Sequence, residues 1–179
     1  MKFVYCMDME NGEKVFLPRD HVEDPAYRFE DHRVRQIIPY VVIKNSDGRV
    51  GVFQRLKGDK RLVDGQTIGT GGHIEPEDQE GKRSDILFNA AAREIEEELG
   101  VSDPLSLSMT NISIESYATP VDSVHLGKVF VAELGKPFVC QDGELEFVGW
   151  KTFKELTGMH LESWSEIIRK DVEKWISNK

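Results

Sequence analysis

Four glutamates lie close together in the segment Arg93-Glu94-Ile95-Glu96-Glu97-Glu98-Leu99-Gly100. Glu94 lies three residues before Glu97 and four before Glu98. In a helix, these spacings place the three carboxylates on one side. Glu96 is rotated by roughly 200° from Glu94 and points away. The three like charges repel one another, and the negative end of the helix dipole adds to the repulsion. The cluster therefore needs either bulk solvent or bound cations around it.

Two explanations of this acidic cluster are open from the segment alone. Acidic helix surfaces are common, so the cluster is explained as a solvated face. The alternative is bound hard cations, because Mg²⁺ accepts carboxylate oxygens, keeps waters and bridges to substrate phosphates. On this segment alone the solvated face is the favoured explanation. The upstream stretch Thr70-Gly71-Gly72-His73-Ile74-Glu75-Pro76 favours the cations. Its glycines allow close approach of the backbone to a ligand, and a backbone carbonyl there could add an oxygen ligand.

The elements around the cluster predict a mixed architecture. Apolar, β-branched or alternating runs predict strands over 2–7, 14–17, 36–44, 50–55, 66–70, 106–118, 124–134 and 145–150. A helix is expected over 84–99, with Ser84 or Asp85 as its N-cap and Gly100 as its stop. A short helix over 152–156 precedes an amphipathic closing helix over 161–176. This order of strands and helices indicates an α/β or α+β sandwich.

Length, composition and charge narrow the class of protein. The chain has 179 residues, 39% of them hydrophobic and 31% charged, which fits one globular domain over 1–179 with 1–35 as an N-terminal extension packed on it. The net charge of −9 argues against long nucleic acid as a partner. Without a signal peptide or an apolar run of roughly 20 residues, we expect a cytoplasmic protein that does not cross a membrane. Cys6 and Cys140 lack metal-ligand spacing and are expected to be reduced thiols.

The glycine turn and the acidic segment together resemble the signature of a known family, the Nudix hydrolases. That signature is a Gly, five residues, a Glu, seven residues, then Arg-Glu, an aliphatic residue, any residue, Glu-Glu, any residue, Gly and an aliphatic residue. Residues 93–101 match its second half at every fixed position, and Gly72 with 73–76 resembles its start. The resemblance spans roughly 36–156. It implies a Nudix-type α/β/α sandwich with a mixed, largely antiparallel central sheet.

The sequence departs from the signature in two ways. Gly72 and Arg93 are 21 residues apart where the signature expects 14, so seven extra residues are expected within 77–84. Such an insertion costs little closure entropy, and the glycine turn can still meet the helix. Counting back eight residues from Arg93 gives Asp85 in place of the signature's Glu. Asp is one methylene shorter, which leaves open whether Asp85 supports Arg93 and the metal site.

The resemblance implies a hydrolase that uses a divalent metal to attack a diphosphate with water. Glu94 and Glu98 would be the main ligands of Mg²⁺ or Mn²⁺, with the backbone of Gly72 as a further ligand. Glu97 would be a ligand or the base that activates water. Arg93 would hold a carboxylate in place through a charge-assisted hydrogen bond. The metal would acidify a water and screen the charge on the phosphates.

Residues outside the signature complete the predicted site. Glu144 is expected to add a carboxylate ligand, because some Nudix relatives carry one at the entrance to the corresponding strand. An exposed loop glutamate is the plainer explanation of Glu144, and Glu115 is a weaker competitor for the role. Arg55 and the basic residues of 57–61 are explained as a phosphate clamp or as surface charge. His73 either contacts substrate or water, or is structural.

Three functions compete. The first is hydrolysis of a small-molecule diphosphate, either a nucleoside diphosphate derivative or a nucleoside triphosphate. The second is a catalytically silent Nudix-fold module that binds nucleotides or regulates, although binding alone would not require every acid. The third, isomerisation of a prenyl diphosphate, ranks last because no cysteine is partnered by an acid. The walls of the pocket set substrate choice and are not readable from the signature, and a homodimer stays open as the assembly.

Overall fold

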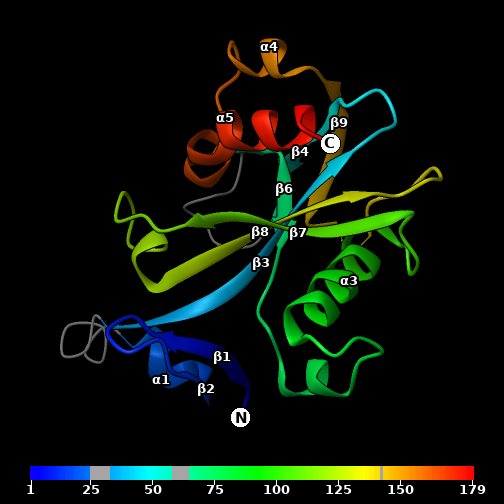
Figure 1. Cartoon of the computed structure of the whole chain (residues 1–179). Helices are drawn as coiled ribbons and strands as arrows, with labels where there is room; N and C mark the ends of the chain where they lie inside the picture. The colour runs from blue at the N-terminus through cyan, green and yellow to red at the C-terminus, as the bar shows by residue number, and fades with distance from the viewer. Residues whose placement is uncertain (25–32, 58–64, 142) are drawn as a thin grey trace.

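The computed structural model describes residues 1–24, 33–57, 65–141 and 143–179, and its backbone forms a mixed sheet with helices on both faces (Figure 1). The strands are β1 (Phe3–Asp8), β2 (Lys14–Pro18), β3 (Val34–Lys44), β4 (Val50–Arg55), β5 (Gln66–Thr67), β6 (Gly69–Gly71), β7 (Ser106–Ile114), β8 (His125–Glu133) and β9 (Leu145–Lys151). The helices are α1 (Arg19–Glu23), α3 (Ile86–Leu99), α4 (Phe153–Leu156) and α5 (Ser163–Ser177), with short 3-10 turns η1 (Pro76–Glu80) and η2 (Asp122–Val124).

Strand β3 organises the sheet. It runs parallel to β8 from Gln36 to Lys44, and antiparallel to β1 at its start and to β6 in its middle. Strand β7 lies antiparallel on the outer side of β8, and β4 lies antiparallel to β9. The sheet is therefore mixed and largely antiparallel, as the sequence predicted.

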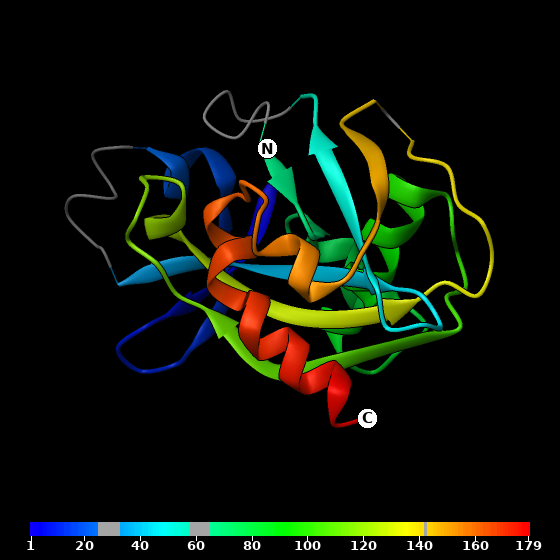
Figure 2. The same cartoon turned by 90° about the horizontal axis from the view of Figure 1, so that it is seen from above.

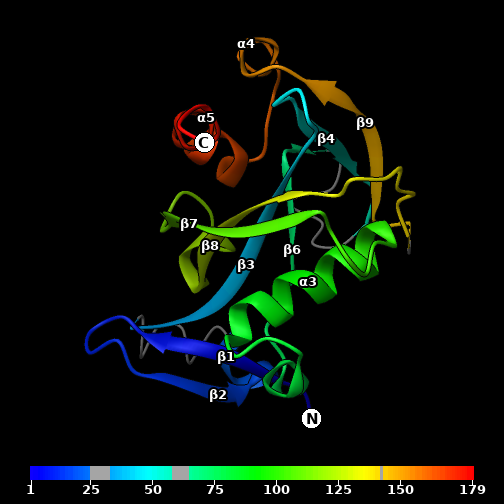
Figure 3. The same ribbon diagram turned by 45° about the vertical axis from the view of Figure 1, so that its right-hand side comes forward.

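Successive residues of β3 point to opposite faces of the sheet, as in any strand. Val41 packs with Ile95 of α3 on one face, and Val42 packs with Ile168 of α5 on the other. Figures 1 and 3 show α3 and α5 on opposite sides of the strands, and Figure 2 shows α5 lying across β7 and β8. All four of these side chains are at most 1% exposed. The two apolar layers confirm the predicted α/β/α sandwich.

The N-terminal hairpin β1–β2 continues the same sheet, because Cys6 pairs with Gln36 of β3. The Tyr5 N–H also donates to the carbonyl of Ile74 at 3.1 Å, so β1 touches the segment that leads into α3 (Figure 3). Helix α1 was not predicted, because five mostly polar residues give no apolar period. Residues 25–32 of the predicted N-terminal extension lie outside the described ranges.

Two smaller features bear on the sequence predictions. Strand β7 ends at Ile114 and not at residue 118, because the Ser116 hydroxyl accepts the N–H of Ala118 at 3.1 Å and takes it from the ladder. Both cysteines are free, as predicted, and burial raises the pKa of Cys6 to about 12. Among the helices of the described ranges, none is long and apolar enough to span a bilayer.

Candidate active site

Helix α3 carries the acidic cluster, and its sequence explains where it begins and ends. Asp85 is the N-cap, and its side chain accepts the N–H of Leu87 at 2.9 Å. Gly100 ends the helix with a φ of 67°, in the left-handed region that favours glycine. Ile95 and Leu99 are buried in the sheet-facing layer. This anchoring fixes which side of the helix presents Glu94, Glu97 and Glu98.

Arg93 joins the members of the cluster. Its Nη1 donates to Oε1 of Glu94 at 2.9 Å and to Oε2 of Glu97 at 3.0 Å. Its Nε and Nη2 donate to the two carboxylate oxygens of Asp78 at 2.9 and 3.0 Å. Nη2 also donates to the carbonyl of His73 at 2.7 Å. A single guanidinium therefore connects α3 to η1 and to the glycine turn through charge-assisted bonds.

Asp78, and not Asp85, is the bidentate carboxylate partner of Arg93. Counting back from Arg93 led to Asp85, whose side chain instead caps the helix. Counting six residues forward from Gly72 reaches Asp78, which is the spacing of the glycine and the acid in the signature. Asp78 is 5% exposed and also accepts the N–H of Glu75 at 2.8 Å. The extra residues therefore follow Asp78 and lie between η1 and α3.

The side chain of Asn89 fastens these extra residues to α3. Its Nδ2 donates to the carbonyls of Asp78 and Arg83 at 2.9 and 2.8 Å, and its Oδ1 accepts the N–H of Arg83 at 2.9 Å. Asn89 is largely buried, so the backbone groups it binds are satisfied without water. Asp78 thus keeps its place beside Arg93 although the loop is longer than the signature allows.

The three glutamates of the cluster have different surroundings. Glu94 is only 6% exposed, Glu98 is half-buried and Glu97 is exposed. Burial raises the pKa of Glu94 to about 7; the adjacent Arg93 guanidinium opposes this rise, and the carboxylates of Glu97 and Glu98 add to it. A buried carboxylate beside two others is costly to ionise unless positive charge is supplied. The cluster therefore has an electrostatic demand that a divalent cation would meet.

Gly72 lies against the carboxylate of Glu94. A Cβ at this position would overlap all three atoms of that carboxyl group, so only glycine lets the backbone come this close. Gly71, one residue earlier, lies as closely against the carbonyl of Pro39 in β3. The end of β6 is thus wedged between the central strand and α3, as the predicted glycine turn requires.

The donor set suits a hard divalent cation. The side chains offer carboxylate oxygens, and the backbone of the glycine turn lies directly against the carboxylate of Glu94. Among the residues that the structure describes, no group of three or more His, Cys, Asp and Glu is already gathered around one point. Arg93 is the partner that Glu94 and Glu97 share, so a cation would have to draw these side chains from it.

The additional carboxylates predicted outside the signature lie in exposed positions. Glu144 is exposed, and its carbonyl accepts the N–H of Leu56 at 2.8 Å. The turn that contains it touches the end of α3, because the Gln141 N–H donates to the carbonyl of Glu98 at 2.7 Å. Glu115 lies beyond β7, and its carboxylate is 3.9 Å from Nη2 of Arg35. The role of Glu144 as a ligand stays a prediction.

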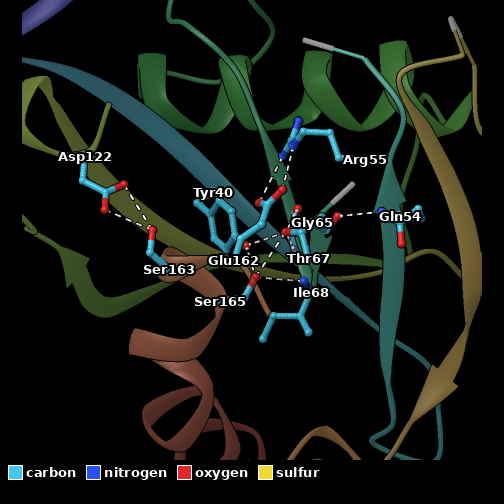
Figure 4. Close-up of polar contacts among 11 residues, drawn as sticks. Tyr40, Gln54, Arg55, Gly65, Thr67, Ile68, Asp122, Glu162, Ser163 and Ser165 are labelled. Carbon is cyan, nitrogen blue, oxygen red and sulfur yellow. Dashed lines mark hydrogen bonds and ion pairs between the residues drawn. The ribbon is translucent and has the colours of Figure 1, made fainter. Parts of the chain in front are cut away.

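Arg55, predicted to clamp phosphates, is paired with an acid that the sequence did not suggest. Its Nε donates to Glu162 at 2.8 Å and its Nη2 lies 3.5 Å from the same carboxylate (Figure 4). Both side chains are mostly buried, and Arg55 also lies in the electrostatic field of Glu98. Lys60 and Arg61 of the predicted basic loop lie outside the described ranges.

His73 contributes its backbone to the cluster through the carbonyl that binds Arg93. The pKa of its ring is lowered to about 3, mainly by burial. Nearby positively charged side chains and His125 also lower this pKa. The ring is therefore neutral at physiological pH. Its Nε2 lies 3.9 Å from a carboxylate oxygen of Glu23 in α1, so the N-terminal segment reaches the glycine turn.

A cavity of about 170 Å³ opens beside the glycine turn. It lies between β3 and the first turn of α5, and Arg55, Gly72 and His73 are on its rim. The other lining residues are Ile38, Tyr40, Gly71, Val121, Asp122, His125, Glu162, Ser163 and Trp164. The predicted substrate residues and the predicted metal turn therefore border one cavity.

Replacing Gly72 with Ala should impair the site. The new methyl group has to displace the Glu94 carboxylate or move β6 away from α3, because both are in place around Gly72. We expect a loss of about 1–3 kcal/mol in the free energy of unfolding, with reduced turnover. Urea denaturation and nucleotide hydrolysis measure the two effects. The control is Gly158→Ala, where the nearest atom is 3.9 Å away; equal behaviour of the two variants would contradict the packing described.

Stability without divalent cations should fall as pH rises. The pKa of Glu94 is about 7 in the fold against an ordinary value of 4.5. The Glu94 carboxyl group therefore contributes up to about 3 kcal/mol to the free energy of unfolding. This contribution is fully present below pH 4.5 and is lost as pH rises through about 7. Urea denaturation in EDTA should show this pH dependence in the wild type and not in Glu94→Gln, whereas Glu96→Gln should behave as the wild type. A wild-type profile that matches Glu94→Gln would refute the raised pKa.

Comparison with known proteins identifies the family. The family model for the NUDIX domain matches residues 34–174. Protein YmaB of Bacillus subtilis (strain 168) is 30% identical over 148 residues, which cover 78% of this chain and 71% of that protein. The solved structure of Tm1382 has a TM-score of 0.74 at 24% identity, covering 97% of this chain and 100% of that one. The structure of DR0079 from Deinococcus radiodurans has a TM-score of 0.65 at 20% identity, covering 94% and 98%.

The two structures are under 25% identical to this chain and show the fold alone. The family match carries the identification, because it extends over most of the chain and includes the glycine turn, Asp78 and all of α3. The chain therefore belongs to the Nudix hydrolase family.

Proposed function

We propose that the chain hydrolyses a phosphoanhydride bond in a nucleoside diphosphate derivative or a nucleoside triphosphate, with Mg²⁺ or Mn²⁺. One observation carries this proposal: α3 presents three carboxylates, two of them bonded to Arg93, with Glu94 against the glycine turn. An acidic protein repels an anionic substrate, and divalent cations bound between the two would offset this repulsion. The substrate on this view is a small cytoplasmic molecule.

In this proposal Glu94 and Glu98 are the main metal ligands, with the backbone of Gly72 as a further one. Glu97 is a ligand or the base that takes a proton from water, and its exposed position suits either role. Arg93 keeps its bidentate bond to Asp78 and so holds the site together. When bound, the divalent cation supplies charge neutralisation on the phosphates and a more acidic water.

Arg55 and Glu144 take secondary roles. The guanidinium of Arg55 borders the cavity and lies in the field of Glu98, so it is placed to contact a phosphate near the cluster. The Glu162 carboxylate that binds it limits the directions in which Arg55 can point. Glu144 stands in a turn joined to the end of α3 and is proposed as a supplementary ligand.

The test is hydrolysis of a nucleotide panel in the presence of Mg²⁺ or Mn²⁺, with release of phosphate or nucleoside monophosphate as the readout. We expect release that stops in EDTA and returns when the metal is restored. Nucleotide binding without any release would instead identify the catalytically silent module. Crystals soaked in Mn²⁺ give an independent check, since anomalous density away from α3 would contradict the assigned ligands.

A further inference from the structure

Most residues that line the cavity beside the glycine turn have no role in the proposed hydrolytic chemistry, which uses only Gly72 and Arg55 of them. Its walls are apolar at Ile38, Val121 and the rings of Tyr40 and Trp164, which meet edge to face with centroids 5.7 Å apart. Its volume of about 170 Å³ is enough for a flat ring system. A pocket of mostly apolar walls with a few polar groups is the usual form of a small-molecule site.

The floor of the cavity is held by a buried network of hydroxyl groups (Figure 4). The Tyr40 hydroxyl lies 2.8 Å from both Thr67 Oγ1 and Ser165 Oγ, and Ser165 Oγ accepts the N–H of Ile68 at 3.0 Å. These bonds tie β3, β5 and α5 together with no exposed member. A satisfied buried network of this kind rigidifies its surroundings, so the cavity has a fixed shape.

Two carboxylates, those of Asp122 and Glu162, supply hydrogen-bond acceptors on the walls. Asp122 is 2% exposed, and its carboxylate accepts from Ser116 at 3.2 Å and from Ser163 at 3.0 Å, both on Oδ2. The Ser163 Oγ also lies 3.3 Å from Oδ1, so its single proton is shared between the two carboxylate oxygens. Oδ1 therefore keeps lone pairs that can accept a further hydrogen bond. Because the Ser163 proton points to Asp122, its own lone pairs face elsewhere. The donors of Arg55, by contrast, are directed at Glu162.

The charges of the wall residues likewise favour a ligand that donates hydrogen bonds. Asp122 and Glu162 carry two negative charges against the single positive charge of Arg55, which Glu162 already binds. A phosphate inside the cavity would therefore be repelled. The glycine turn and Arg55 place the cavity next to the acidic cluster of α3, where the phosphates of the proposed substrate would lie.

We propose that this cavity binds the base of the nucleotide substrate, and that the Asp122 carboxylate selects bases that carry an exocyclic amino group. This inference rests on the proposed function, because it takes the substrate to be a nucleotide. An exocyclic amino group, as in cytosine and adenine, donates hydrogen bonds, whereas an oxo group at the same position presents lone pairs. A buried carboxylate attracts the first and repels the second. Asp122 is thus a specificity residue that lies outside the family signature.

Two matched pairs of nucleotides test the selection. CTP and UTP differ in an amino against an oxo group, and ATP and ITP differ in the same way. We expect kcat/KM to be at least about tenfold higher for CTP than for UTP and for ATP than for ITP. Hydrolysis with equal rates within both pairs, or with a preference for the oxo members, overturns the inference and leaves the hydrolase assignment standing.

Asp122→Asn assigns the selection to its residue. The amide keeps an acceptor for the serine hydroxyls and adds an N–H₂ donor, so the preference for amino bases should shrink or reverse. Asp171→Asn makes the same chemical change on the exposed side of α5, outside the cavity, and should leave the preference unchanged. A preference that survives intact in folded Asp122→Asn overturns the assignment to Asp122. If that variant does not fold, the wild-type pairs still decide whether the selection exists.

Binding without metal separates a failure of this inference from a failure of the proposed function. Calorimetry in EDTA compares CMP with UMP and AMP with IMP, which contain no phosphoanhydride bond. Tighter binding of CMP and AMP supports the cavity assignment even if no nucleotide is hydrolysed, in which case only the hydrolase proposal is lost. Equal binding within each pair, together with no hydrolysis, overturns both.

Discussion

Glu98→Gln is expected to lower turnover at least about a hundredfold, because a proposed metal ligand loses its charge. An amide oxygen is a weaker ligand for Mg²⁺ than a carboxylate, and the remaining acids would bind the cation less tightly. The measurement is kcat for the best nucleotide of the panel, repeated over a range of Mg²⁺ concentrations. A loss of affinity should appear as a higher Mg²⁺ concentration at half-maximal rate.

The matched control for this variant is Glu96→Gln on the same helix. Glu96 is exposed, and the helical spacing turns it away from Glu94 and Glu98. Its removal changes the net charge by the same amount and should leave turnover within about twofold of the wild type, since exposed charges contribute little. Equal rates in the wild type and Glu98→Gln would remove the basis for metal binding by α3.

Asp78→Asn is expected to destabilise the fold by about 2–4 kcal/mol and to reduce activity together with it. The Asp78 carboxylate accepts from Nε and Nη2 of Arg93 and from the N–H of Glu75, and the residue is buried. In the amide, an N–H₂ group would face one of these donors and leave it unpaired in a buried place. Urea denaturation at pH 7 gives the free energy of unfolding, and nucleotide hydrolysis gives the rate.

Asp85→Asn is the paired control. Asn is as good an N-cap as Asp, so the bond to the Leu87 N–H is kept and the stability should stay within about 0.5 kcal/mol of the wild type. The pair also decides between the two ways of aligning the family signature. If Asp85→Asn were the more damaging variant, the acid partner of Arg93 would have been misassigned to Asp78.

The sequence predicted α3 and its strands well because local chemistry sets these elements. Asp85 and Gly100 are cap residues at either end of one apolar stripe, and the structure ends the helix there. The alternating faces of β3 follow from the same kind of local pattern. Helix α1 was missed because it is short and polar, and such segments are held by contacts that no local period shows.

The partners of the site residues were much harder to predict. Counting from one end of the signature led to Asp85, although counting from Gly72 would have found Asp78, so the signal existed and was ambiguous. The pairing of Arg55 with Glu162 spans 107 residues and depends on how α5 meets β4. No spacing rule could give it. The cavity walls come from several distant segments for the same reason, and Asp122 had no motif around it.

The amide of Asn89 has a consequence for redesigning the loop ahead of α3. This one side chain binds the backbone at both ends of the extra segment, at Asp78 and at Arg83. Gly81 has to stay glycine, because a Cβ there would overlap the Asn89 amide. The other residues between Asp78 and Arg83 can change while Arg93 keeps its partner. A peptide tag or a sensor domain could be inserted next to the exposed Lys82, with Gly81 kept, without a change at the reaction centre. Trimming the segment to the usual family length would instead remove the Arg83 backbone groups that now bind the Asn89 amide.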